Sequence, residues 1–453
     1  MTPLNVPVSP LDAWLGKRMN AAPTPANLAE YQVARLRDTL DCALRTSPFY
    51  QERLRGLEPH VIRRPEDLAV LPRTDAADLA ERGDDFLCLS RSDIARVVTL
   101  QTSGTTGPAK RLYFTEQDLE ATLDFFHHGM TTFAGPGDRV LILLPVDRPD
   151  SVGDLLARSL ERLGAEAVPF GLPGPDGSGK GPAEALKALL EARATCVVGF
   201  PVNVLALARG CRGSGAARKC VHSVLLCSDH VPGSLARSVE EAWECTVLAH
   251  WGMTESGLGG GVECQARCGY HLRETDIYVE VTDPDTGRLL PPGKTGEILL
   301  TTLTRRGMPL IRYRTGDLAA MLPGPCPCGS AMRRLGPVCG RRGAALRLCG
   351  RKALTIEELD EVLFAIPGLL DFSATLKGSC LESYLDIRYW TLAMGPRLPA
   401  KVDRAMGLLL SSKRIEGINL GLALSPADEP PTPPGAKRRL TDERTENTRC
   451  ANS

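Results

Sequence analysis

Short apolar runs alternate with segments of helical periodicity between residues 139 and 226 of this 453-residue chain. The runs lie at 139–144, 166–170, 196–199 and 221–226. They are typical of strands buried on both faces, and the spacing at 152–163 and 182–192 is typical of connecting helices. The alternation predicts an α/β fold with a largely parallel sheet. Upstream, apolar residues recur at helical spacing over 27–54, which predicts one amphipathic helix there.

The pattern changes after about residue 274. Strands are expected at 277–281 and 296–302, around a turn rich in Pro and Gly, which predicts an antiparallel subdomain. A boundary is expected near Gly340. The prediction is therefore a large N-terminal domain over 1–340 and a small, mobile α+β domain over 341–453. The tail from residue 425 is rich in Pro and charge, which predicts partial disorder.

Charge and composition exclude several classes of protein. The 54 Lys and Arg residues are balanced by 54 Asp and Glu residues, so no basic face for a nucleic acid is expected. No window reaches the roughly 18 uninterrupted apolar residues of a membrane span. The first residues lack a basic segment followed by an apolar core, so we expect no signal peptide and a cytoplasmic protein. The expected partner is a small molecule, and the sequence does not decide whether the protein forms a homodimer.

A loop rich in Gly, Ser and Thr follows the β-rich run at 96–100. Such a loop can bind a polyphosphate, because it offers backbone N–H groups, hydroxyl donors, close approach and one cation. Its spacing differs from that of the Walker motif, and neither Ser nor Thr follows the lysine. A flexible surface turn is the alternative. The candidate phosphate-binding residues are Thr102, Ser103, Gly104, Thr105, Thr106, Gly107 and Lys110.

Four ordered motifs resemble those of the adenylate-forming superfamily, which comprises acyl-CoA synthetases, adenylation domains and luciferases. The first is the loop ending at Lys110, and the others are His250-Trp251-Gly252-Met253-Thr254-Glu255, Gly296-Glu297 and Arg312-Tyr313-Arg314-Thr315-Gly316-Asp317. Further segments, among them Ser47-Pro48-Phe49-Tyr50 and Gly269-Tyr270-His271, resemble the phenylacetate–CoA ligase branch. The resemblance implies a large adenylate-forming domain, with parallel-rich sheets and an antiparallel subdomain, followed by a small mobile domain.

The resemblance also implies a role for each motif. Adenylation is the attack of a carboxylate on the α-phosphate of ATP, with loss of pyrophosphate, so negative charge must be neutralised. Glu255 would be the protein ligand of Mg²⁺, and Thr254 would hydrogen-bond the α-phosphate. Taken alone, Glu255 has the alternative of a solvated surface carboxylate, Asp317 that of a turn residue, and Trp251 that of a core aromatic. The other nucleotide-binding positions are Trp251 and Gly252 at the adenine, Asp317 at the ribose and Arg341 near the domain hinge.

The chain has 15 cysteines. Without a secretion signal, this number favours reduced thiols or metal ligands over a disulfide framework. Thiolates combined with an imidazole suit tetrahedral zinc, and some members of the resembled branch carry such a set. We therefore hypothesise a structural zinc site, with buried free cysteines as the alternative. Its ligands would be Cys264, His271, Cys326 and Cys328, and substitute ligands would be Cys268, Cys339 and Cys349.

The chain departs from the family pattern in three places. The acidic residue that usually follows the hinge Gly-Arg is missing, because Arg342 and Gly343 follow Arg341. The family's terminal Gly-Lys-x-x-Arg element reads Gly435-Ala436-Lys437-Arg438-Arg439 here, so Lys437, the candidate catalytic lysine, stands one residue late. A solvated basic tail is the alternative. Segment 145–153, which corresponds to the acid pocket, lacks the Gly-rich, aromatic sequence of the family members that act on aryl acids. Phenylacetate is therefore not assigned as the substrate.

Three functions follow from these motifs. The first is an ATP-dependent carboxylic acid–CoA ligase, which uses Mg²⁺ and coenzyme A and forms an acyl-adenylate and then a thioester, releasing AMP and pyrophosphate. The second is an adenylyltransferase that stops at the adenylate, as relatives that adenylylate a deazaflavin cofactor do. The third is a degenerate nucleotide-binding protein without turnover. Pyrophosphate release with and without coenzyme A separates the three.

Overall fold

The computed structural model describes residues 10–100, 109–173, 181–211, 220–347, 353–378, 383–391, 398–412, 421–427, 429–433 and 435–444. The chain divides into two compact units, each built from three segments. The first unit contains Met1–Gly135, Arg158–Leu163 and Leu248–Cys339. The second contains Pro136–Ala157, Gly164–Val247 and Gly340–Ser453. The functional division into domains over 1–340 and 341–453 stays a prediction.

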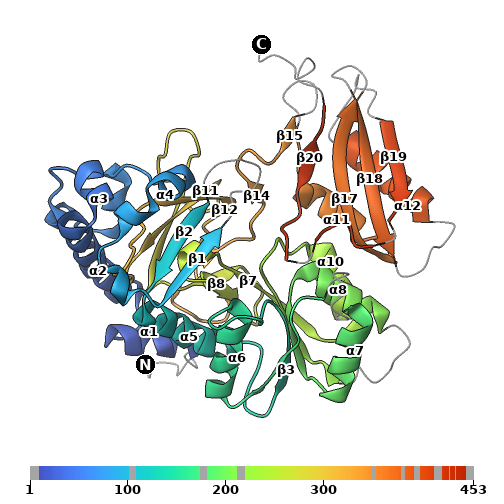
Figure 1. Ribbon diagram of the computed structural model, residues 1–453, viewed down its shortest axis with the longest axis horizontal. Coiled ribbons are helices and arrows are strands. Elements are labelled where there is room, and N and C mark those ends of the chain that lie inside the picture. The colour runs from blue at the N-terminus through green and yellow to red at the C-terminus, as the bar shows by residue number, and fades with distance from the viewer. Residues whose placement is uncertain are drawn as a thin grey trace, which may run out of the picture. The chain divides into compact units, whose positions relative to one another are not determined.

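The first unit begins with the helices α1 (Pro10–Met19), α2 (Pro25–Thr46) and α3 (Pro48–Arg53), followed by α4 (Ala76–Arg82) and α5 (Glu116–Met130) (Figure 1). The prediction of a single helix over 27–54 is wrong, because the helix is interrupted at Ser47. The Ser47 hydroxyl accepts the backbone N–H of Tyr50 at 3.4 Å and caps α3. Pro48 has no N–H to continue α2, but it suits the first position of α3.

The strands of the first unit pair antiparallel. The hairpin β1 (Arg96–Leu100) and β2 (Lys110–Phe114) precedes a sheet of β10 (Ile277–Thr282), β11 (Thr295–Thr302) and β12 (Tyr313–Ala320). A further group pairs in the order β7 (Thr246–Trp251), β8 (Gly261–Glu263), β9 (Tyr270–Leu272) and β13 (Arg334–Leu335). The antiparallel character predicted after residue 274 is confirmed by this pairing; β10 and β11 are buried on both faces, whereas burial alternates along β12.

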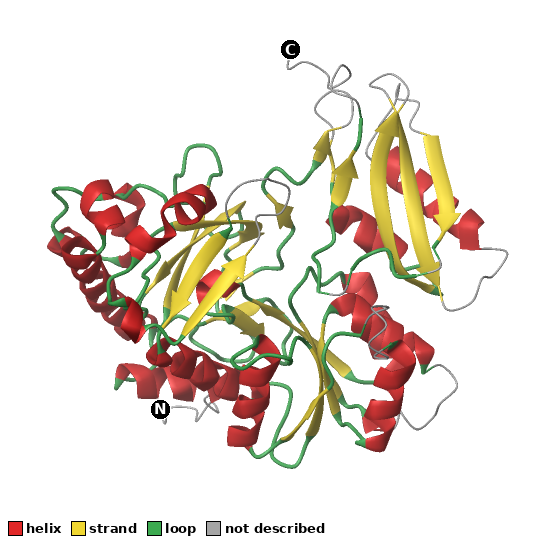
Figure 2. Cartoon of the chain, viewed as in Figure 1, coloured by secondary structure: helices red, strands yellow, loops and turns green. Residues whose placement is uncertain are grey.

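The second unit contains the predicted parallel strands. They lie in the order β4 (Glu166–Pro169), β3 (Arg139–Leu143), β5 (Cys196–Gly199) and β6 (Ser223–Leu226). The connecting helices are α7 (Pro182–Glu191), α8 (Pro201–Gly210), α10 (Gly233–Trp243) and the first half of α6 (Val152–Leu163), whose residues 158–163 belong to the first unit. Figure 2 shows α7, α8 and α10 together on one side of these strands. Their apolar faces form one core with the strands, which explains the continuous apolar runs in the sequence.

The C-terminal part of the second unit is an α+β module. After the short strands β14 (Gly340–Arg341), β15 (Leu346–Arg347) and β16 (Ala353–Leu354), it contains α11 (Ile356–Leu363), β17 (Leu369–Gly378), β18 (Ser383–Thr391), α12 (Leu398–Ser412), β19 (Gly421–Pro426) and β20 (Leu440–Asp442). The strand order is β19-β18-β17-β20, and β20 runs parallel to β17. The charged tail thus adds a strand to this sheet. The predicted α/β fold with an antiparallel part and a small α+β part is confirmed.

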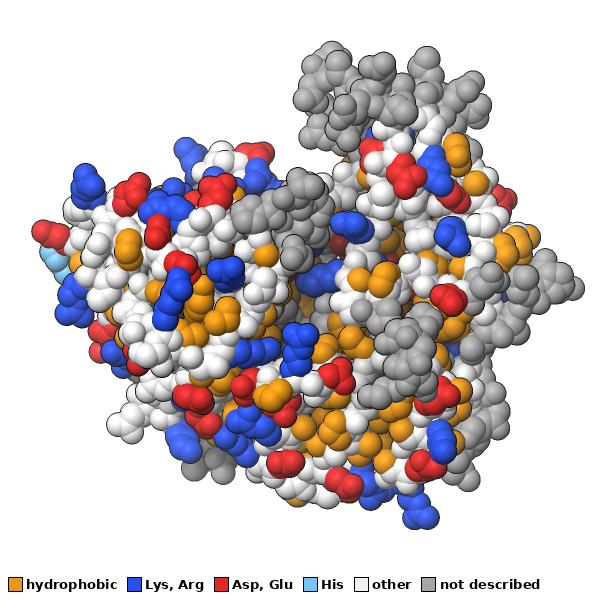
Figure 3. Space-filling view, in the orientation of Figure 1, with side chains coloured by type: hydrophobic (Ala, Val, Ile, Leu, Met, Phe, Trp, Pro, Cys, Tyr) orange, Lys and Arg blue, Asp and Glu red, His pale blue; other side chains and the backbone are white. Residues whose placement is uncertain are grey.

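The surface charges and the hydropathy of the helices can be compared with the predictions from composition. On the face shown in Figure 3, acidic and basic side chains are interspersed. Among the described helices, none has the length and hydropathy that a membrane crossing requires.

Candidate active site

Three polar side chains from separate segments of the first unit meet at Glu255. Lys110, the first residue of β2, places Nζ 2.6 Å from Glu255 Oε1. Tyr313, the first residue of β12, donates its hydroxyl to the same oxygen at 2.9 Å and accepts the Lys110 ammonium at 3.2 Å. The candidate residues Lys110 and Glu255 are therefore direct partners, although 145 positions separate them in the chain.

The rest of the predicted phosphate loop lies outside the described residues, which stop at Leu100 and resume at Ala109. This applies to Thr102, Ser103, Gly104, Thr105, Thr106 and Gly107. The frame of the loop is described, because β1 and β2 pair with Leu100 opposite Lys110. The loop is thus framed by two residues that are neighbours across a hairpin, one of which contacts Glu255.

The environment of Glu255 favours an anion despite burial. Only 4% of the Glu255 side chain is exposed, against 14% for Lys110. Burial by itself would raise the pKa of Glu255, but the Lys110 ammonium and the Tyr313 hydroxyl outweigh it and lower this pKa below its usual value. The buried Arg305 donates to the backbone carbonyls of Glu255 and Tyr113 at 3.1 and 3.0 Å. Two cations beside one acidic segment suit a site for a polyanion.

A tight turn after β7 positions Glu255. It contains the 3-10 helix η5 (Thr254–Ser256), and Gly257 follows in the left-handed conformation with φ +74°. A Cβ at position 252 would lie 2.4 Å from the carbonyl oxygen of Leu258, so Gly252 is required for the turn to close. Thr254 and Glu255 are successive residues of η5, which places both predicted catalytic groups of this motif in one turn.

Trp251 and Asp317 form a second contact in the first unit. Trp251 ends β7 and donates its indole N–H to Asp317 Oδ2 at 3.4 Å. Both residues are buried, and the ring packs so closely on Gly260 that a Cβ there would lie 2.5 Å from ring atoms. The tryptophan therefore orients the carboxylate at the predicted ribose position, a contact that the sequence did not indicate.

Two ion pairs hold the neighbours of Tyr313. Arg312 pairs with Glu280 of β10 at 3.1 Å, and Arg314 pairs with Glu297 of β11 at 2.6 Å. Both carboxylates are almost fully buried, so loss of either arginine would leave an unpaired buried charge. The motifs contain both arginines and Glu297 without an assigned role. Their ion pairs fix the backbone on both sides of Tyr313 and so help to position its side chain.

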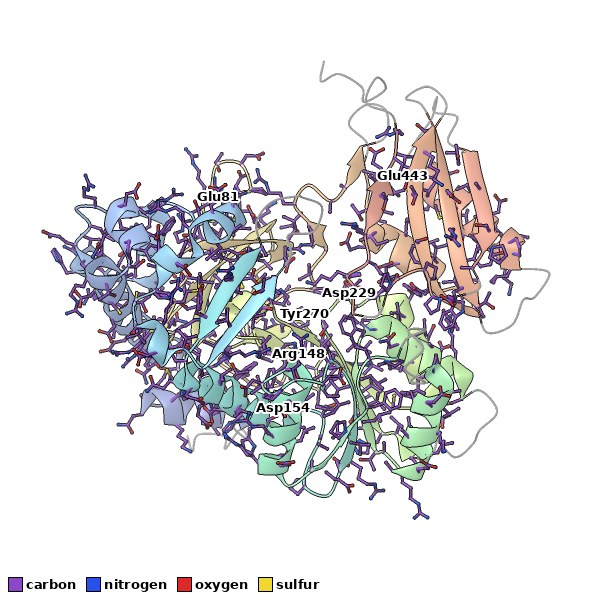
Figure 4. The ribbon with its side chains drawn as sticks, viewed as in Figure 1. Glu81, Arg148, Asp154, Asp229, Tyr270 and Glu443 are labelled. Carbon is purple, nitrogen blue, oxygen red and sulfur yellow. The ribbon has the colours of Figure 1, made fainter. Side chains whose placement is uncertain are left out.

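Arg341 and Lys437 belong to the second unit, whereas the residues above belong to the first. Arg341 lies on β14, and both side chains are exposed. Arg438, the neighbour of Lys437, is buried and donates to Asp360 at 2.6 Å. Its backbone N–H also donates to Asp229 at 3.3 Å, a residue labelled in Figure 4. The basic segment is therefore anchored by Arg438, while Lys437 is exposed.

The four predicted zinc ligands meet in the first unit. One ligand atom from each of Cys264, His271, Cys326 and Cys328 lies within 4.8 Å of all the others. The Sγ atoms of Cys264 and Cys326 are 3.6 Å apart, and Cys328 Sγ is 3.4 Å from His271 Nε2. Tetrahedral zinc, with bonds of about 2.3 Å to sulfur and about 2.0 Å to nitrogen, spaces its ligand atoms by about 3.5–3.8 Å. The distances suit that ion and are too long for a disulfide.

Outer contacts of the cluster also suit a metal. The backbone N–H groups of Ala266 and Ser330 point at the sulfurs of Cys264 and Cys328, each at 3.4 Å. Burial raises the pKa of Cys264 to about 12 and lowers that of His271 to about 4. A metal would replace the thiol proton and would bind the neutral imidazole that burial already favours.

The substitute ligands lie elsewhere or outside the described residues. Cys268 donates to the carbonyl of Ala266 at 3.1 Å, and the exposed Cys339 donates to that of Leu318 at 3.3 Å. Cys349 is not among the described residues. Within the described chain, the cluster therefore consists of the four ligands predicted first.

Arg305 is a site residue that sequence reasoning missed. It stands in an Arg-Arg pair outside all four motifs, and its charge resembles that of any surface arginine. Its contacts are to backbone carbonyls of residues 50 and 192 positions away. No local pattern marks such contacts, so only the tertiary structure identifies it.

Comparison with known proteins agrees with the motifs. The AMP-binding enzyme family matches residues 89–303. Phenylacetate-coenzyme A ligase of Thermus thermophilus is 29% identical over 349 residues, which cover 75% of this chain and 76% of that protein. The Pseudomonas putida protein of the same name is 28% identical over 345 residues, covering 74% and 75%.

Solved structures show the same fold. The 2-hydroxyisobutyryl-CoA ligase in its postadenylation state has a TM-score of 0.79 at 22% identity, covering 93% of this chain and 90% of that one. The same ligase in its thioesterification state has a TM-score of 0.65 at 24% identity. The solved structures show the fold, while the family match, the phenylacetate-coenzyme A ligases and the four motifs support an assignment to the adenylate-forming superfamily, in its phenylacetate–CoA ligase-like branch, as an enzyme of the AMP-forming ligase class.

Proposed function

We propose that the protein joins a carboxylic acid to coenzyme A in two steps at the expense of ATP. In the first step the acid's carboxylate oxygen attacks the α-phosphorus, the bond to the bridging oxygen breaks, and pyrophosphate leaves. In the second step the thiol of coenzyme A loses its proton and attacks the acyl carbon, and AMP leaves. The observation that carries this proposal is the buried cluster of Lys110, Glu255 and Tyr313, next to a loop of phosphate-binding composition.

Glu255 is the proposed magnesium ligand. Its Oε1 contacts Lys110 and Tyr313, and a buried, ionised carboxylate is the hard oxygen donor that Mg²⁺ takes together with phosphate oxygens. Bound there with ATP, the ion would neutralise phosphate charge. Lys110 would supply a second positive charge, and Thr254 would donate its hydroxyl to the α-phosphate.

The remaining nucleotide contacts follow from the same resemblance. Asp317, whose orientation Trp251 fixes, would accept the ribose hydroxyls, while the indole and the Gly252 turn would border the adenine. By the same resemblance, Arg341 is the proposed hinge arginine and Lys437 the proposed lysine that contacts the acyl-adenylate. The phosphate loop residues 102–107 complete the proposed site.

The acid itself is not assigned. The curated relatives are named for phenylacetate and a solved structure for 2-hydroxyisobutyrate, but segment 145–153 of this chain lacks the aryl-acid text. A cytoplasmic location and a homodimer remain predictions from the sequence.

The test is pyrophosphate release from purified protein, with ATP, Mg²⁺ and a panel of aliphatic, hydroxylated and aryl acids, with and without coenzyme A. A CoA-dependent thioester together with AMP is the expected result. Release without thioester would replace the ligase by an adenylyltransferase, and nucleotide binding without release for any acid would leave a degenerate protein.

Two substitutions test the cluster. Glu255→Gln and Lys110→Ala should each slow adenylation at least about tenfold, roughly 1.4 kcal/mol in the barrier. Glu81→Gln is the matched control, because Glu81 is an exposed carboxylate of α4, labelled in Figure 4. Unchanged rates in both cluster variants would show that the site is misassigned.

We also propose structural zinc at Cys264, His271, Cys326 and Cys328. The ion would link β9 and the end of β8 to the segment before β13 and so stabilise the strands beside the Trp251–Glu255 turn. Metal analysis should show that Cys326→Ser loses about one equivalent of zinc relative to wild type. Less than about half an equivalent in undamaged wild-type protein would contradict the proposal.

A further inference from the structure

A second group of metal-binding side chains lies at the amino ends of the parallel strands in the second unit. Asp138 directly precedes β3, Cys196 begins β5, and His222 directly precedes β6. His222 Nε2 is 2.9 Å from Asp138 Oδ1 and 3.7 Å from Cys196 Sγ, and all three ligand atoms lie within 4.8 Å of one another. None of the three residues belongs to an adenylation motif or to the proposed zinc cluster of the first unit.

The sheet holds these residues in fixed positions. In the parallel register Cys196 stands opposite Val140 on one side and Ser223 on the other. The backbone N–H of His222 donates to the Thr195 carbonyl at 2.9 Å, next to the first paired residues of the strands. Because parallel strands that start together bring their first residues to one edge, the side chains converge without a flexible loop.

Further hydrogen bonds orient two of the three side chains. The Thr195 hydroxyl donates to Asp138 Oδ1 at 2.8 Å, and the Ser223 hydroxyl donates to Cys196 Sγ at 3.1 Å. Outer contacts of this kind orient metal ligands and stabilise their anionic forms. Burial raises the pKa of Cys196 to about 11, so without a cation the thiol keeps its proton at neutral pH.

The arrangement differs from that of a nucleophilic cysteine. A catalytic relay uses the two ring nitrogens of histidine separately, one toward the nucleophile and one toward the carboxylate. Here both contacts involve Nε2 of His222, and one nitrogen cannot serve both in that way. A cation between sulfur, nitrogen and oxygen uses the same three atoms at once.

We propose that Asp138, Cys196 and His222 bind a zinc ion, with water as the fourth ligand. Tetrahedral zinc spaces sulfur and nitrogen by about 3.5 Å and nitrogen and oxygen by about 3.3 Å, so the observed 3.7 and 2.9 Å need to change by only a few tenths of an ångström. On binding, the Cys196 proton passes to solvent, and thiolate and carboxylate balance the two positive charges. Exposure of 55% of the His222 side chain and 20% of Asp138, beside the fully buried Cys196, gives the ion a route from solvent.

Zinc and cobalt titration of the full-length, metal-free protein tests the site. A background with Cys264→Ser, Cys326→Ser and Cys328→Ser removes every thiolate of the cluster of the first unit, so the second site can be measured separately. In that background we expect one zinc per chain, and His222→Ala should weaken binding at least about tenfold. The matched control is His60→Ala, which removes an exposed histidine 3.3 Å from Glu58 and should leave affinity unchanged.

Spectra and folding provide the second measurement. In the background that lacks the three first-unit thiolates, the Co²⁺-loaded protein should show a thiolate-to-cobalt charge-transfer band that Cys196→Ser abolishes. Circular dichroism of metal-free His222→Ala should match wild type, because its side chain is more than half exposed. Equal zinc affinity in His222→Ala and its parent, or a cobalt–thiolate band that survives Cys196→Ser, would overturn the proposal. Neither result depends on acid activation, so failure of the proposed enzymatic function would be seen separately.

Discussion

Burial should make the Lys110–Glu255 pair energetically stronger than an exposed pair of equal length. At 2.6 Å and an effective dielectric constant of about 20, the attraction is about 6 kcal/mol, and desolvation of the two charges offsets several kcal/mol of it. Replacing one partner leaves the other charge buried. We expect Lys110→Met to cost about 3–4 kcal/mol, because Glu255 is only 4% exposed, and Glu255→Gln to cost about 2–3 kcal/mol, because Lys110 is 14% exposed.

A double-mutant cycle measures the coupling. The double variant removes both charges and should cost about 2–3 kcal/mol less than the sum of the single variants. Because the chain has two units, the free energy of local opening should be measured by hydrogen exchange of the β12 amides.

The exposed pair Arg162–Glu120 is the matched control. Its closest atoms are also 2.6 Å apart, but its side chains are 41% and 60% exposed, so water screens the attraction. Its coupling should stay below about 1 kcal/mol. Equal coupling energies in the two cycles would refute the argument, because distance rather than burial would then set the strength.

Four other substitutions have defined outcomes. Asp317→Asn should raise the KM for ATP about tenfold in adenylation kinetics, since the ribose would lose an anionic acceptor; an unchanged KM would contradict that role. Lys437→Ala should lower acyl-adenylate turnover at least about tenfold, and Arg439→Ala should not; equal rates would leave Lys437 as a solvated tail residue. Arg438→Met should destabilise the second unit by about 3 kcal/mol in urea unfolding, because a buried carboxylate loses its partner, whereas Arg439→Met should change it by less than about 0.5 kcal/mol. Burial lowers the pKa of His250 from 6.5 to about 4, so the stability that depends on the neutral imidazole is present above pH 6.5 and is lost as the pH falls toward 4. Between pH 7 and 5, wild type should lose about 2 kcal/mol more of its free energy of unfolding than His250→Gln. Equal losses would show that His250 titrates normally.

Local patterns predicted the elements of this protein well where burial is uniform. The strands at 139–144 and 196–199 are found where they were predicted, because burial on both faces leaves a continuous apolar run, and the helix at 152–163 is found because its apolar residues recur on one buried face. The helix over 27–54 was wrong for a local reason. Periodicity continues across residue 47, but the capping serine and Pro48 end one helix and begin another.

By itself, the sequence predicted the family, the order of the motifs and the four side chains of the Cys/His cluster in the first unit. Spacing and residue type carry that information, since phosphate, magnesium and zinc each select particular atoms. The tertiary structure alone decided which atoms meet. Glu255 receives Lys110 from 145 residues away, and Arg305 reaches the same turn through backbone carbonyls.

The group of Asp138, Cys196 and His222 likewise exists only in the folded sheet. No local pattern marks any of the three residues as a metal ligand. The sequence also does not indicate that their three segments are neighbours in the sheet. Hydrogen bonding between parallel strands sets which residues start together, and that register brings a carboxylate, a thiol and an imidazole to one edge.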